Sequence, residues 1–142
     1  MLTRRGFAVS SFLGALTLPS AAGATQVAEM KVVYHLSDLE KVSPALRNIH
    51  NHYAGMRGDP IKITLVVLAP ALSVFRNSAS VDISAPFREL VDDFGLEALA
   101  CSNSLRAEGI AVDDLLRGFR TTPSGVVTIA QRQVQGYAYI RP

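Results

Sequence analysis

The residue with the clearest potential for chemistry is Cys101, the single cysteine of the 142-residue sequence. It follows a short apolar run, Leu96–Ala100, that predicts a buried strand, and it precedes Ser102 and Asn103, which are favourable residues at a helix N-terminus. A strand that passes directly into a helix places a cysteine near backbone N–H groups, which stabilise a thiolate. The sequence therefore predicts a reactive thiol at Cys101, assisted by Asn103. A buried, inert cysteine is the alternative, because free cysteine is among the most buried residue types.

The histidines offer fewer possibilities. His35 lies near the end of the first predicted strand, where an imidazole could lower the pKa of a nearby thiol or relay a proton. The alternative is a ring satisfied by a nearby backbone carbonyl. His50 and His52 are two residues apart on a predicted helix, so they point in different directions and do not form a metal site by spacing alone. Motifs for nucleotide binding and serine hydrolysis do not occur, so we expect neither a cofactor nor a metal.

The net charge of the chain and its single cysteine limit the kinds of molecule to which the protein is expected to bind. Lys and Arg total 14 and Asp and Glu total 12, but Arg4 and Arg5 fall in a predicted leader, so the rest of the chain has no net charge. Nucleic acid is therefore an unfavourable partner, because no basic stripe remains to neutralise phosphates. One cysteine forms no disulfide within its own chain, so it is buried, reactive or paired with another chain.

Residues 1–24 have the pattern of an export signal peptide. Arg4 and Arg5 precede an apolar stretch of 13 residues, Gly6–Leu18. This stretch is shorter than the roughly 20 residues that span a bilayer. Ala22–Ala24 has the small-x-small pattern of a signal peptidase site. A buried first helix is the alternative interpretation of this segment.

The same segment bears on the route of export. Thr3–Phe7 (TRRGF) resembles the twin-arginine motif, which a receptor recognises, and the general secretory route is the alternative. We expect a single domain at residues 25–142 that is periplasmic and has no membrane attachment after cleavage.

Strands and helices alternate along residues 25–142. Apolar runs predict strands at Lys31–Leu36, Ile61–Leu68 and Leu96–Ala100, Tyr137–Ile140 is the predicted closing strand, and Phe119–Thr122 is a further short strand. Helical spacing predicts helices that begin near Ser43, Ser84, Ser102 and Ser124. The last of these has apolar side chains available for burial at Val126, Val127, Ile129, Ala130 and Val134. The alternation predicts right-handed βαβ units and an α/β domain: a three-layer sandwich with a mostly parallel sheet of about five strands.

This order of elements places the candidate residues at one edge of the sheet. His35, the loop Ala69–Ser80, Cys101 and the loop Thr121–Ser124 all lie at the carboxyl ends of predicted strands. In an open α/β sheet, ligands bind at that edge. We therefore expect these four segments to share one rim.

Several segments occur in an order and spacing that is fairly specific when they are taken together. They are Val32–Leu36, Ala45–Ile49, Lys62–Leu68, Ala100–Leu105 with Gly109 and Ile110, and Pro123–Ile140. Over Lys31 to Pro142 the chain resembles the DsrE/DsrF-like family of small sulfur-relay proteins, as an exported member. The resemblance implies a flavodoxin-related topology, a homo-oligomer that is a trimer or hexamer, and a persulfide carried at Cys101. Many relatives have a Gly- and His-containing stretch where this chain has Ala69–Leu72.

Two functions of different classes follow. The first is a periplasmic sulfur carrier, in which the Cys101 thiolate accepts a sulfane sulfur as a persulfide and passes it to a partner thiol. Such a protein is a carrier more than an enzyme, at most sulfurtransferase-like. The second is a non-catalytic oligomeric module that binds a small ligand or a protein at the same rim, with Cys101 inert in the core. A metal or redox accessory protein is a third alternative.

Overall fold

The computed structural model describes residues 27–142, so the predicted leader and its cleavage site lie outside the described residues. Its strands are β1 (Met30–Leu36), β2 (Ile61–Val67), β3 (Glu97–Cys101), β4 (Phe119–Thr122) and β5 (Ala138–Ile140). The helices are α1 (Val42–Gly55), α2 (Val81–Asp92), α3 (Ser102–Glu108) and α4 (Gly125–Val134), with 3₁₀ turns η1 (Leu39–Lys41), η2 (Ala71–Phe75) and η3 (Val112–Asp114). Within 27–142, none of these helices is both long and apolar enough to cross a bilayer.

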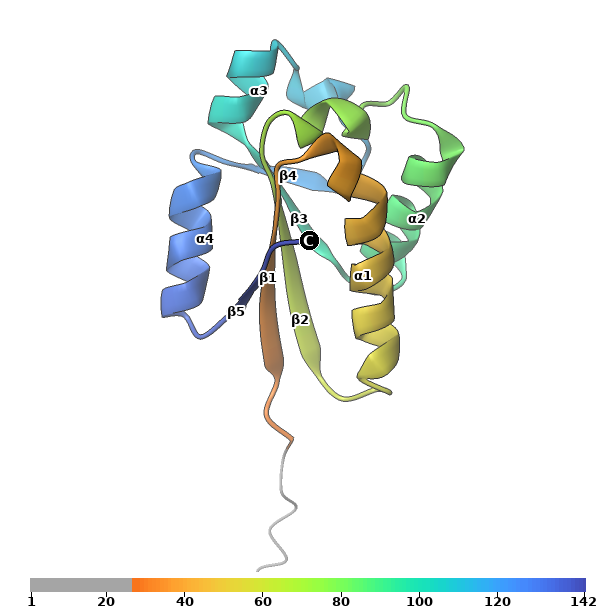
Figure 1. Ribbon diagram of the computed structural model, residues 1–142, viewed down its shortest axis with the longest axis vertical. Helices are drawn as coiled ribbons and strands as arrows, with labels where there is room; N and C mark the ends of the chain where they lie inside the picture. Colours follow the sequence, from red (N-terminus) through yellow and green to blue (C-terminus); the bar gives the residue numbers. More distant parts are fainter. Residues whose placement is uncertain (1–26) are drawn as a thin grey trace, which may run out of the picture.

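All five strands are parallel and form one sheet in the order β4-β3-β2-β1-β5. The chain steps from β1 to β4 in one direction and then returns across the whole sheet to β5. Because parallel crossovers are right-handed, the forward steps place α1 and α2 on one face and the return places α4 on the other, as Figure 1 shows. The predicted three-layer α/β sandwich is confirmed. In the flavodoxin order the second strand lies outside the first, whereas here the last strand, β5, takes that place.

The face covered by α1 and α2 contains the larger core. Alternate residues of each strand point into it, among them Val32, Ile63 and Ala98, which are at most 1% exposed. An aromatic cluster joins α2 to the sheet edge: the Phe87 and Phe119 rings are stacked with centroids 4.7 Å apart. This packing fixes β4 against α2, and β4 carries residues of the site described below.

The opposite face is covered by α4 alone among the described elements. Its apolar core is small and consists of Val33, Val66, Leu99, Ile129 and Tyr137, with Leu68 packed against it. One helix cannot cover five strands, so part of the β3–β4 surface beside α4 remains open to solvent.

Two local expectations were wrong. Helix α2 begins at Val81, one turn before Ser84, because the Ser80 carbonyl accepts the N–H groups of Ile83 and Ser84. On α4, only Ile129 and Gly125 are buried. The valines that seemed available for burial point outward, and Val134 is 90% exposed, because the helix turns Thr128 and Arg132 towards the sheet.

Candidate functional site

Cys101 is the last residue of β3 and directly precedes α3. Residues at i, i+2 and i+4 of a strand share a face, so Glu97, Leu99 and Cys101 all point towards α4. The thiol lies beneath the first residue of α4, where the backbone N–H of Gly125 donates a hydrogen bond to Cys101 Sγ at 3.2 Å. The prediction that Cys101 lies where a strand passes into a helix therefore agrees with the structure.

The surroundings of the Cys101 thiol act on its pKa in opposite directions. Burial raises the pKa, because the residue is only 3% exposed and a thiolate loses hydration there. Hydrogen bonds from the N–H groups of Gly125, Ser104 and Asn103 and from the Ser104 hydroxyl lower it, and together they outweigh burial, so the pKa lies below its ordinary value. The groups that lower it are all uncharged, so the thiolate is stabilised by oriented dipoles from α3 and α4.

Gly125 is the closest approach of α4 to the thiol. A Cβ atom at this position would lie 2.9 Å from Leu68 Cδ1 and 3.3 Å from Cys101 Cβ. Both distances are shorter than ordinary contacts, so the absence of a side chain is what allows the helix to approach the sulfur.

Asn103 and His35 occupy different positions relative to the thiol. The backbone N–H of Asn103 contributes to the thiol environment, while its side chain accepts a hydrogen bond from Arg106. His35 is on β1, and its Nδ1 is 2.8 Å from the hydroxyl of Tyr139 on β5, so its ring is engaged at the opposite side of the sheet from β3. Burial, and secondarily the positive charge of Arg141, lower the pKa of His35, so the ring is neutral at pH 7. Assistance by His35 stays a prediction.

A polar groove of about 380 Å³ lies beside α4 on the face of the sheet to which Cys101 points. We call it the α4 groove. Strands β3 and β4 contribute its floor and α4 contributes its wall. Its lining residues are Glu97, Leu99, Arg120, Thr121, Thr122, Thr128, Gln131, Arg132 and Gln135.

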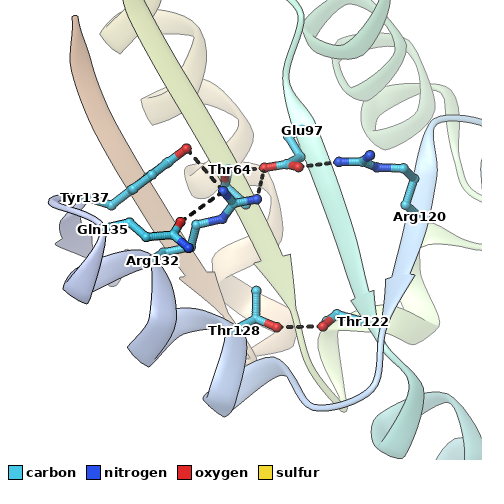
Figure 2. Close-up of polar contacts among 8 residues, drawn as sticks. All are labelled: Thr64, Glu97, Arg120, Thr122, Thr128, Arg132, Gln135 and Tyr137. Carbon is cyan, nitrogen blue, oxygen red and sulfur yellow. Dashed lines mark hydrogen bonds and ion pairs between the residues drawn. The ribbon is translucent and has the colours of Figure 1, made fainter.

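A charged network stands at one end of the α4 groove (Figure 2). The Glu97 carboxylate accepts hydrogen bonds from Thr64 Oγ1 at 2.6 Å, from Arg132 Nη2 at 2.6 Å and from Arg120. The Arg132 guanidinium also lies over the Tyr137 ring, 5.0 Å from its centroid. Two guanidinium groups share one carboxylate, so the network has a net positive charge.

The other end of the α4 groove is lined by Thr122 and Thr128, and Cys101 lies behind this end without lining it. Thr122 is the register partner of Cys101, and its hydroxyl is 2.5 Å from the Thr128 hydroxyl on α4 (Figure 2). The α4 groove therefore extends from the guanidinium pair to the strand position beside Cys101.

The α4 groove and the role of Gly125 were not predicted from the sequence. A signal was present at Glu97, a charged residue inside an otherwise apolar strand, because such a residue needs a partner when the strand is covered. A second signal was the glycine after the helix-capping residue Ser124, where a side chain is normally tolerated.

Comparison with known proteins agrees with this architecture. Residues 20–142 match the DsrE/DsrF-like family. The structure is similar to that of MTH1491, a protein of unknown function from Methanobacterium thermoautotrophicum, with 36% identity and a TM-score of 0.72 over 80% of this chain and 99% of that one.

A second solved structure is similar in fold only. It is the ychN protein from E. coli, with 15% identity and a TM-score of 0.62 over 80% of this chain and 99% of that one. No curated protein shows significant similarity to the sequence. The family match covers most of the chain, and the first of these structures supports it at the level of sequence as well as fold. The chain therefore belongs to the DsrE/DsrF-like family.

Proposed function

We propose that this protein is a periplasmic sulfur carrier that holds a sulfane sulfur on Cys101 as a persulfide. The DsrE/DsrF-like family is a sulfur-relay type of family, which supports the general class. The observation that carries the proposal is the thiol environment: N–H groups from two helices converge on a sulfur at the carboxyl edge of the sheet and lower the thiol pKa. Such an environment favours the thiolate, which is the nucleophilic form.

The proposed step conserves atoms and electrons. The Cys101 thiolate attacks the outer sulfur of a donor persulfide, the donor's sulfur–sulfur bond breaks, and the donor leaves as a thiolate. A thiolate on a partner protein then attacks the outer sulfur of the Cys101 persulfide and regenerates the Cys101 thiolate. The N–H groups of Gly125, Ser104 and Asn103 stabilise the anion before and after each transfer. No net oxidation occurs.

The direct test is the intact mass of the mature protein after incubation with inorganic polysulfide and removal of the donor. We expect an increase equal to one sulfur atom per chain, which a reductant reverses. Because the sequence contains one cysteine, the position of the adduct is unambiguous. Absence of any adduct, under conditions that modify an established carrier, would contradict the proposal.

A second candidate function is supported by the burial of Cys101. At 3% exposure, the residue also fits a packing role in a non-catalytic binding module. Labelling by a small thiol reagent separates the two functions. Labelling of the native protein supports the carrier, whereas labelling only in denaturant supports the module.

Export is predicted from residues 1–24. We expect the mature N-terminus near Thr25, and if the twin-arginine route is used, changing Arg4 and Arg5 together to lysine should prevent export. N-terminal sequencing of the periplasmic fraction and immunoblotting of cell fractions would measure both results. An uncleaved cytoplasmic protein would contradict the export assignment, and normal export of the lysine variant would indicate the general secretory route.

Self-association is predicted through the outer face of α4. Val126, Ala130 and Val134 are spaced by four residues and therefore share that face, where Val126 is 60% and Val134 90% exposed. Burial against a second copy would remove these valines from water. We expect light scattering to give the mass of a trimer or hexamer, and Val134→Asp to reduce it.

The control for this prediction is Val81→Asp. Val81 is 71% exposed but lies at the start of α2 on the other face, so its substitution should leave the mass unchanged. A monomeric parent protein at micromolar concentration would contradict self-association. An unchanged mass for Val134→Asp would exclude this face as the interface.

A further inference from the structure

We propose that the α4 groove binds the small-molecule sulfur donor: an extended thiol persulfide of about tripeptide size, with a carboxylate at the end away from its sulfur. This inference rests on the proposed function, because it assigns the donor for Cys101. It is based on the charge, the length and the position of the α4 groove, none of which is needed for folding of the larger core on the other face.

The charge of the α4 groove favours an anionic group. Glu97 is the one acidic residue of the lining, its side chain is 15% exposed, and three donors already occupy its oxygens. Arg120 lines the groove, is 71% exposed and uses one terminal nitrogen on Glu97, so its other guanidinium donors are open to solvent. A guanidinium presents five N–H donors in a planar fork, and a carboxylate is its geometric complement.

The length of the α4 groove sets the size of the ligand. Leu99 pairs with Arg120 and Cys101 pairs with Thr122, so the arginine and the thiol are two strand positions apart, about 7 Å along the strand. The Arg120 side chain extends further, towards Glu97, which is four positions or about 13 Å from Cys101. An extended tripeptide spans about 10 Å, whereas a simple inorganic anion cannot bridge this separation.

The remaining lining residues suit a peptide-like backbone. Gln131 on α4, Gln135 directly after it and Thr128 opposite Thr122 supply both hydrogen-bond donors and acceptors, and Leu99 supplies a small apolar floor. A ligand with a carboxylate at one end, a sulfur at the other and amide groups between them matches the order of these side chains along the groove. Its sulfur would lie beside Thr122, the strand neighbour of Cys101.

The test uses glutathione as the probe and the Cys101→Ser protein, which cannot exchange sulfur with it. Titration calorimetry should show saturable binding that weakens about tenfold in Arg120→Gln, because a charge-assisted hydrogen bond is lost. The matched control is Arg117→Gln. Arg117 is also exposed and paired with a carboxylate, that of Asp92, but it lies outside the α4 groove, so its loss should leave binding unchanged.

A second measurement uses the thiol of the unmodified protein. Arg120→Gln should slow sulfur uptake from glutathione persulfide about tenfold and slow uptake from inorganic polysulfide much less, because a short polysulfide anion does not reach from Arg120 to the thiol. Unsaturable glutathione binding, or equal binding by Arg120→Gln and the parent, would overturn the inference. In that case sulfur uptake from polysulfide would still support the carrier function. Glutathione binding without sulfur uptake from any donor would instead refute the carrier and retain the groove as a ligand site.

Discussion

Replacing Cys101 by serine is expected to abolish the uptake of sulfane sulfur completely. The sequence contains no other cysteine, and a serine hydroxyl does not form a persulfide. The substitution is nearly isosteric, and the Gly125 N–H can donate to the serine oxygen as it does to the sulfur. Intact mass after incubation with polysulfide measures the loss, and circular dichroism with light scattering shows whether the fold and the oligomer are retained.

This variant also tests where any added sulfur resides. An adduct on the Cys101→Ser protein would show that sulfur associates elsewhere, and the proposed site would then be wrong. Loss of the adduct together with loss of the fold would not count as support, so the thermal unfolding of both proteins is compared first. Ser104→Ala is an intermediate variant, because it removes one hydroxyl donor to the thiol and should weaken uptake without abolishing it.

Gly125→Ala is expected to raise the pKa of the Cys101 thiol by about one unit. The new methyl group would lie 2.9 Å from Leu68 Cδ1, which can rotate away, and 3.3 Å from Cys101 Cβ, which is tighter than an ordinary contact. We expect the start of α4 to move away from Cys101 by a fraction of an ångström, which lengthens the hydrogen bond from its N–H to the sulfur. A hydrogen bond to a charged group contributes about 1.5–3 kcal/mol, and partial loss corresponds to about one pKa unit. The ultraviolet absorbance of the thiolate as a function of pH measures the midpoint directly.

The same substitution should also slow sulfur uptake at pH 7. A pKa higher by one unit reduces the thiolate fraction at most about tenfold, but a more basic thiolate is a better nucleophile, so the net decrease is at most about threefold. The wild-type midpoint itself should lie below the pKa of a free cysteine. The pH profile should therefore shift to higher pH in the variant, with a smaller change in the maximal rate.

Two further variants separate a local effect from general damage. Gly55→Ala changes a helical glycine whose added methyl group would meet nothing within 4 Å, so the thiol pKa should not change. Leu68→Ala combined with Gly125→Ala removes the nearest contact of the new methyl group and should restore part of the lower pKa. A thiol pKa in Gly125→Ala that equals the wild-type value would show that the approach of α4 does not control the thiolate.

The sheet and the position of Cys101 could be predicted because both are encoded in short segments. Ile61–Val67 is apolar except at Lys62 and Thr64 and is buried from Ile63 onward, as expected for a central parallel strand covered on both faces. Cys101 follows such a strand and precedes residues with good capping propensity, so its place at the carboxyl edge followed from local pattern alone. The order of strands and helices then determined the fold class.

Which side chains of α4 are buried could not be predicted, because this depends on where the connection from β4 to β5 crosses the sheet. Val126 and Val134 have the composition of a core helix, yet a helix that alone covers one side of the sheet buries only a narrow stripe. The charged network of the α4 groove could not be predicted from neighbouring residues either. Glu97 and Arg132 are 35 residues apart in the sequence, and they meet only because the chain returns across the sheet through α4. Gly125 acquires its role from an approach to Cys101 that is fixed by tertiary packing.

The return of the chain to β5 has a consequence for when the thiol becomes competent. The position of α4 depends on pairing of β5 with β1, where Val32 meets Ala138, roughly 100 residues away along the chain. Contacts of such long range form late in folding, because loop closure must be completed first. Before that moment Cys101 lacks the Gly125 donor and has only the donors of α3, Asn103 and Ser104. We therefore expect the thiol pKa to reach its lowest value only when the native topology is complete.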